Sequence, residues 1–220
     1  MENASTPLAQ VRQNIAKAAK IARRAEGDIA LIAVSKKHPA AAIETLLAEG
    51  QRIFGENRVQ EAQEKWPALR EAYPDAELHL IGQLQSNKAD DAVELFDCIH
   101  SLDRESLLKA LAKAMDKADK RVPCFVQVNI GGEDQKGGVA IGDLPEFLAK
   151  VEEAKIPLAG LMCIPPSDIE PAPFFAFLGK LADKNNLTGL SMGMSSDFET
   201  AIMLGATHIR VGTALFGERE

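Results

Sequence analysis

The chain has 220 residues, 46% of them hydrophobic, and its 25 Lys and Arg residues against 32 Asp and Glu residues give a formal net charge of −7. The hydrophobic share allows a sizeable core and excludes disorder for most of the chain. The acidic balance argues against a nucleic-acid-binding protein, because phosphate backbones are bound by basic surfaces.

The first predicted element is a helix near the N-terminus. Residues 11–24 contain five Lys or Arg residues and no acidic residue, a composition shared with organelle transit peptides. Apolar residues recur there at spacings of three and four, however, as on the buried face of an amphipathic helix. Pro7 follows Ser5 and Thr6, which is a typical helix start. We therefore expect residues 1–27 to form a helix that packs on the domain that follows.

Eight short apolar runs come next, and amphipathic segments separate them. Strands that alternate with helices pair in parallel, because a parallel neighbour needs a crossover connection. The predicted strands are 29–35, 52–54, 77–82, 96–100, 123–130, 157–164, 188–193 and 207–211. The predicted helices are 40–49, 57–72, 86–94, 104–119, 143–154, 171–184 and 196–204.

Eight such units are the number that closes a (β/α)₈ TIM barrel, whose usual size is about 200–250 residues. The alternative is a doubly wound open sheet, which usually has about six strands. No linker rich in Pro, Gly or Ser divides the chain. We therefore predict an α/β fold with one barrel domain over residues 28–220, and one domain overall with the N-terminal helix.

In such barrels the active site lies at the carboxyl ends of the strands. Ser195 follows the seventh predicted strand, and Gly212 with Thr213 follows the eighth. Glycine lets the backbone approach an oxyanion, and a hydroxyl adds a donor, so these two loops predict a phosphate-binding site. The alternative is helix capping, because Ser196 and Glu199 have the spacing of a capping box.

Lys36 follows the first predicted strand, on the same side as Ile32 and Val34. Desolvation at the barrel mouth and the neighbouring charge of Lys37 both favour a neutral, nucleophilic amine that forms Schiff bases. A solvated lysine pair at a strand end is the alternative. Together with a phosphate site, such an amine suits pyridoxal 5′-phosphate (PLP) or a phosphorylated sugar aldehyde.

Arg210 alternates with Ile209 and Val211 and is predicted to point into the barrel. It could bind the phosphate, pair with a carboxylate, or donate a hydrogen bond to the pyridine nitrogen of PLP. In the last case the nitrogen stays unprotonated, because arginine keeps its proton in proteins. The ring is then a weaker electron sink, which disfavours carbanion chemistry but not Schiff-base formation.

Other polar residues give weaker indications. Asn57 could contact a bound ring. The spacing of Asn57 and Gln60 is equally consistent with a helix N-cap. His79 is interpreted as a core or mouth histidine rather than a base, and the remaining histidines show no metal-ligand spacing, so no metal site is predicted. Glu56 and Asp197 are carboxylates at strand ends without an identifiable partner.

The cysteines and the apolar runs bear on location. Cys98, Cys124 and Cys163 are widely spaced and odd in number, which fits free thiols in a reducing compartment, so we expect a cytoplasmic protein. The apolar runs are shorter than the roughly 18 residues that a membrane span needs, so no membrane association is expected.

Six strings spread from the first strand to the end of the chain resemble those of the pyridoxal phosphate homeostasis (YggS-type) proteins. No single string is specific, but their combination is. The strings are AVSK (33–36), FGENRVQE (54–61), HLIGQLQSNK (79–88), GLMCIPP (160–166), SMGMSSDFETAI (191–202) and RVGTALFG (210–217).

The resemblance implies a bare PLP-binding barrel of the alanine racemase type. It implies that Lys36 holds PLP as a Schiff base and that Arg210 faces the pyridine nitrogen. Arg58 stands where an aromatic residue is often found, which alters the charge near the mouth, and Ser196 stands where an acidic or small residue is often found. The residues matching positions that hold the phosphate or flank the ring are Asn57, Ser195, Gly212 and Thr213.

Three functions were compared: a PLP carrier that serves vitamin B6 homeostasis and passes PLP to apoenzymes, an amino-acid racemase, and a class I aldolase. Racemisation needs two positioned bases; Lys36 is one, and the single tyrosine, Tyr73, is expected away from the mouth. Alanine racemases also carry a C-terminal β domain, whereas this chain ends soon after the last strand. We therefore favour a monomeric carrier without turnover over a racemase, and the aldolase does not account for the resemblance.

Overall fold

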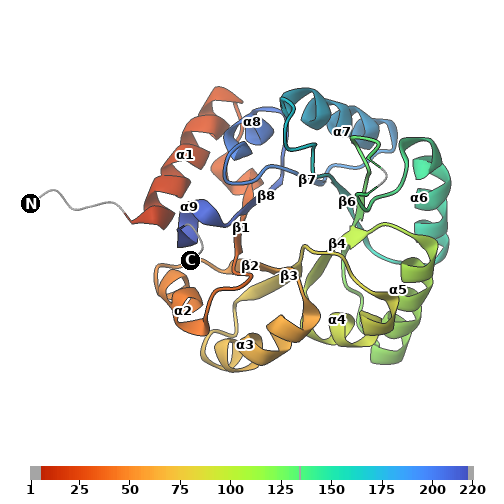
Figure 1. Ribbon diagram of the computed structural model, residues 1–220, viewed down its shortest axis with the longest axis horizontal. Helices are drawn as coiled ribbons and strands as arrows, with labels where there is room; N and C mark the ends of the chain where they lie inside the picture. Colours follow the sequence, from red (N-terminus) through yellow and green to blue (C-terminus); the bar gives the residue numbers. More distant parts are fainter. Residues whose placement is uncertain (1–5, 134, 218–220) are drawn as a thin grey trace, which may run out of the picture.

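The computed structural model describes residues 6–133 and 135–217. Within these residues eight parallel strands pair in chain order, and β1 pairs with β8 to close a barrel (Figure 1). This confirms the predicted (β/α)₈ barrel. The strands are β1 (Ala30–Val34), β2 (Ile53–Glu56), β3 (Glu77–Leu80), β4 (Cys98–Leu102), β5 (Cys124–Gln127), β6 (Leu158–Met162), β7 (Leu190–Ser191) and β8 (His208–Val211).

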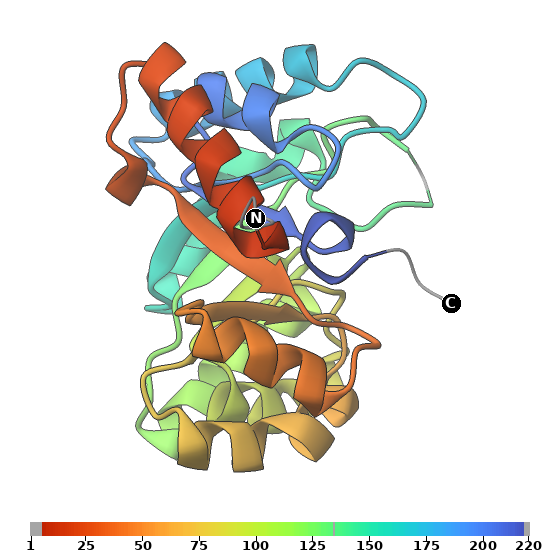
Figure 2. The same cartoon turned by 90° about the vertical axis from the view of Figure 1, so that its left-hand side faces the viewer.

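The helices form a ring around the strands (Figures 1 and 2). Three short 3₁₀ turns, Glu26–Asp28, Ser86–Lys88 and Ile141–Asp143, join the described elements. The α-helices are α1 (Pro7–Ile21), α2 (Ala40–Ala48), α3 (Val59–Ala72), α4 (Ala89–Leu95), α5 (Glu105–Ala118), α6 (Leu144–Glu153), α7 (Ala172–Lys184), α8 (Phe198–Met203) and α9 (Thr213–Phe216).

Helix α1 lies outside the barrel against α8 and α9 (Figure 1). Thr6 caps it, since its hydroxyl oxygen accepts a hydrogen bond from the Ala9 N–H at 3.2 Å, and Pro7 stands at the first helical position. Leu8, Val11 and Ile15 are buried in the same apolar cluster as the barrel helices. The predicted segment 1–27 thus contains an ordinary amphipathic helix, and its first five residues lie outside the described part of the chain.

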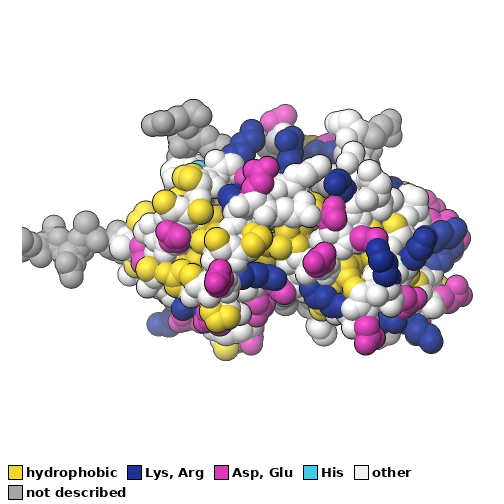
Figure 3. Space-filling view, turned by 90° about the horizontal axis from the view of Figure 1, so that it is seen from below, with side chains coloured by type: hydrophobic (Ala, Val, Ile, Leu, Met, Phe, Trp, Pro, Cys, Tyr) yellow, Lys and Arg dark blue, Asp and Glu magenta, His cyan; other side chains and the backbone are white. Residues whose placement is uncertain are grey.

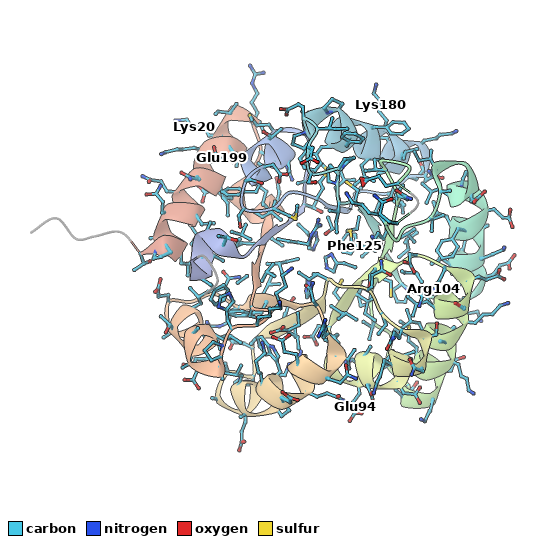
Figure 4. The ribbon with its side chains drawn as sticks, viewed as in Figure 1. Lys20, Glu94, Arg104, Phe125, Lys180 and Glu199 are labelled. Carbon is cyan, nitrogen blue, oxygen red and sulfur yellow. The ribbon has the colours of Figure 1, made fainter. Side chains whose placement is uncertain are left out.

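The apolar core lies between the strands and the helix ring, while the barrel interior is a separate environment. A smaller apolar cluster there consists of Cys98, Phe125 and Met162, and Figure 4 labels Phe125 near the barrel axis. Strand residues with the opposite alternation point outward and pack under the helices. They include Leu31, Ala33, Phe54, Leu78, Leu80, Ile99 and Ile209.

The outer surface carries charge of both signs. Basic and acidic side chains are interspersed over the face that Figure 3 shows. None of the helices in the described ranges is both long enough and apolar enough to cross a membrane.

Candidate functional site

A cavity of about 590 Å³ opens at the carboxyl ends of the strands. A depression of about 630 Å³ at the amino ends of β1 and β8 is similar in size, but none of the predicted site residues lines it. All six predicted site residues, by contrast, line the mouth cavity. Its lining residues are Val34, Lys36, Asn57, Ile81, Ile164, Met194, Ser195, Ser196, Arg210, Gly212, Thr213 and Ala214.

Lys36 lies in the turn that follows β1, and a lysine of α3 holds this turn from outside. Lys65 Nζ donates to the carbonyl oxygens of Ser35 and His38, at 3.0 and 3.3 Å, on either side of Lys36. Lys37, within the turn, has a left-handed backbone conformation with φ of 63°. The turn therefore presents Lys36 in a defined conformation, at a local cost in backbone energy.

Two carboxylates complete this support. Glu56 is buried and accepts hydrogen bonds from Ser35 Oγ at 2.7 Å and Trp66 Nε1 at 3.3 Å, and it pairs with Lys65 at 2.7 Å. Sequence reasoning missed these partners, because they are 9 to 21 residues away. Glu61 accepts from the Lys37 N–H and pairs with Lys65. Burial raises the pKa of Glu61, but these hydrogen bonds outweigh that effect and lower it.

Asn57 lines the cavity and does not cap the following helix. The N-cap residue of α3 is Arg58, and no side chain makes a cap hydrogen bond there, so the N-cap alternative for Asn57 is wrong. Arg58 is exposed and lines a neighbouring depression with Lys88. Arg58, the basic residue that differs from the family pattern, therefore lies beside the cavity and does not line it.

The loops after β7 and β8 meet at Ser195. Its Oγ accepts from the Gly212 N–H at 3.1 Å and the Ala214 N–H at 3.4 Å, so amide groups of the last loop converge on one oxygen position. Such a convergence suits an oxyanion. Thr213 is exposed beside it and begins α9, which sequence analysis missed.

The predicted capping box after β7 is not formed. Helix α8 begins at Phe198, its N-cap residue is Asp197, and no side chain caps it. Asp197 instead accepts from the Met194 N–H at 2.6 Å and so braces the loop that carries Ser195. Ser196 is left exposed at the cavity rim.

Arg210 points into the barrel, as its position in the strand indicated, and its side chain is buried. Its Nη1 donates to Ser191 Oγ at 2.6 Å and its Nη2 to the Cys163 carbonyl oxygen at 2.9 Å. These acceptors are neutral, so the hydrogen bonds of the described residues do not support pairing with a carboxylate. Burial lowers the pKa of Arg210, partly opposed by Cys163 and Asp197.

Sequence analysis missed a cluster of histidines beneath Arg210. His79 Nδ1 lies 3.0 Å from His100 Nε2, and the ring centroid of His208 lies 6.2 and 5.8 Å from theirs. His79 is buried within β3, which agrees with its interpretation as a core histidine. The three residues share the inward side of β3, β4 and β8, and this common alternation was the available signal.

The barrel interior also contains side chains of the kinds that bind metal ions. Nitrogen atoms of His79 and His100 and the sulfur of Cys98 lie within 4.8 Å of one another. The two imidazoles are, however, hydrogen-bonded directly to each other, and burial raises the pKa of Cys98 to about 12. These contacts account for the three residues without a metal ion.

The fold and the cavity define a class: (β/α)₈ barrels with a lysine after the first strand, an inward arginine on the last, and backbone amides that converge on a serine hydroxyl between the loops after the last two. The model of the family described as "Alanine racemase, N-terminal domain" matches residues 7–220. The chain belongs to that family and, within it, to the pyridoxal phosphate homeostasis proteins.

Relatives of this name match along the full chain. The pyridoxal phosphate homeostasis protein of Aquifex aeolicus is 40% identical, covering 99% of both chains, and that of Escherichia coli K12 is 39% identical, covering 100% of this chain and 98% of the relative. The structure of PipY from Synechococcus elongatus PCC7942 with PLP bound has 41% identity and a TM-score of 0.83, covering 93% of this chain and 100% of that one. Alanine racemase from Streptomyces coelicolor, 21% identical with a TM-score of 0.68, shares the fold over 96% of this chain and 59% of its own.

Proposed function

We propose that this protein binds PLP in the mouth cavity and serves intracellular PLP homeostasis, holding the cofactor as a Schiff base on Lys36 and passing it to other proteins. One observation carries the proposal: Lys36, Arg210 and the Ser195–Gly212 loop contact line a single cavity. The relatives' names and the PLP in PipY support the same ligand.

The residues of the cavity fit the chemical groups of PLP. The Lys36 amine binds the aldehyde, which is the reactive group that PLP supplies. Ser195 and the amides of the last loop receive the phosphate, with Thr213 beside them. Arg210 donates to the pyridine nitrogen and keeps it unprotonated.

Asn57 completes the set of cofactor-binding residues from the opposite side of the cavity. It is half-buried at the end of β2 and makes no cap hydrogen bond that would occupy it. Its backbone is packed closely against Gly82, where an added Cβ would lie 2.4 Å from the Asn57 carbonyl oxygen. This packing orders Asn57 where it flanks a bound ring.

The cavity supports a carrier over a racemase. Among the described residues that line the cavity, Lys36 is the one with an amine, imidazole or carboxylate that could serve as a base. Racemisation needs a second base on the other face of the substrate. Tyr73 follows α3 at the amino ends of the strands, where its ring lies 6.0 Å from the Arg52 guanidinium, so it is far from this lining.

Transfer to apo PLP-dependent enzymes is the proposed role of the open mouth, whose rim includes the exposed residues Thr213 and Ala214. The cytoplasm is the proposed location, because Cys98, Cys124 and Cys163 are buried free thiols that a reducing compartment maintains. A monomer is the proposed state, to be checked by light scattering.

Borohydride reduction of the loaded protein tests the binding proposal. Mass spectrometry should find the phosphopyridoxyl group on Lys36, and Lys36→Ala should remove both the visible absorption and the adduct while leaving circular dichroism unchanged. Lys37→Ala is the matched control and should keep the adduct. A stable adduct only on another lysine would contradict the assignment.

Two further measurements test the carrier role. Mixing loaded protein with an apo PLP enzyme should restore that enzyme's activity, and a trap for free PLP distinguishes direct transfer from release. Incubation with single L-amino acids in heavy water should leave the α-hydrogen in place. Rapid exchange or racemisation would instead favour the racemase.

A further inference from the structure

A line of polar side chains runs through the barrel interior, below the cavity. Figure 4 labels Phe125 in this interior, and His100 stacks on its ring with a centroid distance of 4.4 Å. Ser191 on β7, His100 on β4 and His79 on β3 are all buried. The proposed function uses none of the three.

Successive contacts connect them. Arg210 Nη1 donates to Ser191 Oγ at 2.6 Å, and Ser191 Oγ lies 2.8 Å from His100 Nδ1. His100 Nε2 lies 3.0 Å from His79 Nδ1. His79 Nε2 faces Glu77 Oε2 at 3.7 Å, an ion-pair distance that is longer than a direct hydrogen bond. The line thus leads from the cavity to the first residue of β3, at the opposite end of the barrel.

The chemistry of the groups determines the direction of these hydrogen bonds. A guanidinium only donates, so Ser191 Oγ accepts from Arg210 and gives its single hydrogen to His100 Nδ1. Neutral His100 then carries its hydrogen on Nε2 and donates to His79 Nδ1. His79 in turn carries its hydrogen on Nε2, toward the Glu77 carboxylate.

The opposite direction of these hydrogen bonds is unfavourable at both Ser191 and His79. The Ser191 hydrogen would have no acceptor among the contacts of the described residues, and a bare nitrogen of His79 would face the carboxylate of Glu77. Only one arrangement therefore gives Ser191 and His100 a partner for each hydrogen and directs the remaining His79 hydrogen toward the Glu77 carboxylate.

The surroundings favour the neutral form of His100 that this arrangement needs. Burial, with the nearby His79, His208 and Arg210, lowers the pKa of His100 well below its usual value. Burial also lowers the pKa of His208 to about 4. Cys98, the thiol beside the pair, stays protonated because burial raises its pKa to about 12.

We infer that Ser191, His100 and His79 form a hydrogen-bonded relay that positions the Arg210 guanidinium at the cavity and connects it to Glu77 at the far end of the barrel. Among the described residues no carboxylate accepts a hydrogen bond from the buried Arg210 guanidinium, so this cation needs other acceptors. The relay orients a lone pair of Ser191 Oγ toward it. An imidazolium has no acceptor nitrogen, so protonation of either histidine interrupts the relay. The inference rests on the proposed function only for the role of Arg210 toward PLP.

Nitrogen-15 NMR of the histidines in the full chain, with and without PLP, tests the relay directly. His100 should be neutral at pH 7 and at pH 6 with its hydrogen on Nε2, and the neutral form of His79 should likewise carry its hydrogen on Nε2. A hydrogen on Nδ1 of either ring, or an imidazolium at His100 at pH 6, would overturn the relay. This measurement is independent of whether PLP binds.

Two substitutions of His100 test its connection to the cavity. His100→Phe retains stacking on Phe125 but accepts no hydrogen bond, whereas the His100→Asn carbonyl can still accept from Ser191. We expect the PLP dissociation constant to rise about tenfold in His100→Phe, with a shifted absorption band, and to change about threefold or less in His100→Asn.

A second variant and its matched control test the Glu77 end of the relay. Glu77→Gln should shift the pH dependence of the bound-PLP spectrum, while Asp75→Asn, an exposed carboxylate two residues earlier that pairs with Arg52, should not. Borohydride adducts on Lys36 are scored in every variant. Normal adducts with unchanged affinity and spectra in His100→Phe would refute the relay, whereas a wild-type protein without an adduct would refute the proposed function alone.

Discussion

Lys65 shows how one buried cation supports a functional turn. Its side chain is 12% exposed, and it pairs with Glu56, which is fully buried. Removing one partner of a buried pair leaves an uncompensated charge, whereas an exposed pair is screened by water. The position of Lys36 and the stability of the fold therefore depend on the same ion pair.

We expect Lys65→Met to lower the free energy of unfolding by about 3 kcal/mol, as measured by urea denaturation, and to weaken PLP binding. Adding Glu56→Gln should recover part of the stability, because the orphaned carboxylate is then removed. The control is Lys109→Met, since Lys109 is 75% exposed and pairs with Glu105, with an expected loss below about 0.5 kcal/mol. Equal losses at both positions would contradict this account.

His208 makes the fold sensitive to acid. Burial, with the nearby His79 and Arg210, lowers the pKa of His208 from 6.5 to about 4. The unfolded chain thus binds this proton more readily, and stability should fall by roughly 3 kcal/mol as the pH drops from 6.5 to 4. Urea midpoints across this range should show the loss, and His208→Gln should reduce it. A flat profile in the wild type would exclude the effect.

At the scale of residues, alternation along strands predicted more than local motifs did. The inward position of Arg210 and the placement of Lys36 at the mouth follow from a period of two. The capping patterns at Asn57 and Ser196 were locally plausible, but neither residue caps the helix that follows it. Tertiary contacts determine the conformation of both loops. The Lys65 network could not be predicted, because it depends on how α3 packs against β2 and the turn after β1.

Strands β6 and β7 meet through a close backbone contact between two glycines. An added Cβ on Gly189 would lie 1.9 Å from the Ala159 carbonyl oxygen, and one on Gly160 would lie 2.0 Å from the Gly189 carbonyl oxygen. Gly160 also has a φ of 150°. Only residues without a side chain allow this approach, which sets the register of the strand that carries Ser191.

Gly189→Ala is therefore expected to destabilise the protein by about 3 kcal/mol or to prevent folding, because backbone atoms cannot move aside as a flexible side chain does. Gly142→Ala is the matched control: an added Cβ there meets nothing within 4 Å, and its stability should change by less than about 0.5 kcal/mol. Thermal denaturation of both variants checks the contrast, and a fully stable Gly189→Ala would show that β6 and β7 can separate.

At the scale of elements, the count and order of strands and helices were predictable, and the bounds were less so. The fourth strand was expected at 96–100 and runs over Cys98–Leu102, because Phe96 is the buried residue that ends α4. The seventh was expected at 188–193 and has two residues, Leu190–Ser191. Helix α9 has four residues, too few for a periodic signal.

At the scale of the molecule, the proposed ligand should stabilise the whole barrel, because its contacts come from both ends of the chain. PLP at a hundred times its dissociation constant should add about 2.7 kcal/mol to the free energy of unfolding and raise the melting temperature by several degrees. Differential scanning calorimetry measures the shift. Lys36→Ala should lose most of it, and an equal shift in that variant would mean that PLP stabilises the protein elsewhere.

Strand β1 pairs with β8, and Ile32 lies opposite Arg210 in that pairing. The amine of the cavity thus follows the first strand to be synthesised, whereas the arginine lies on the last strand and the amides in the loop after it. During translation all eight strands of the barrel have to leave the ribosome before these groups can meet. A prematurely terminated product that lacks β8 would consequently present Lys36 without the arginine or the loop amides beside it, and the proposed vitamin capture would begin only after β8 and its loop have joined the barrel.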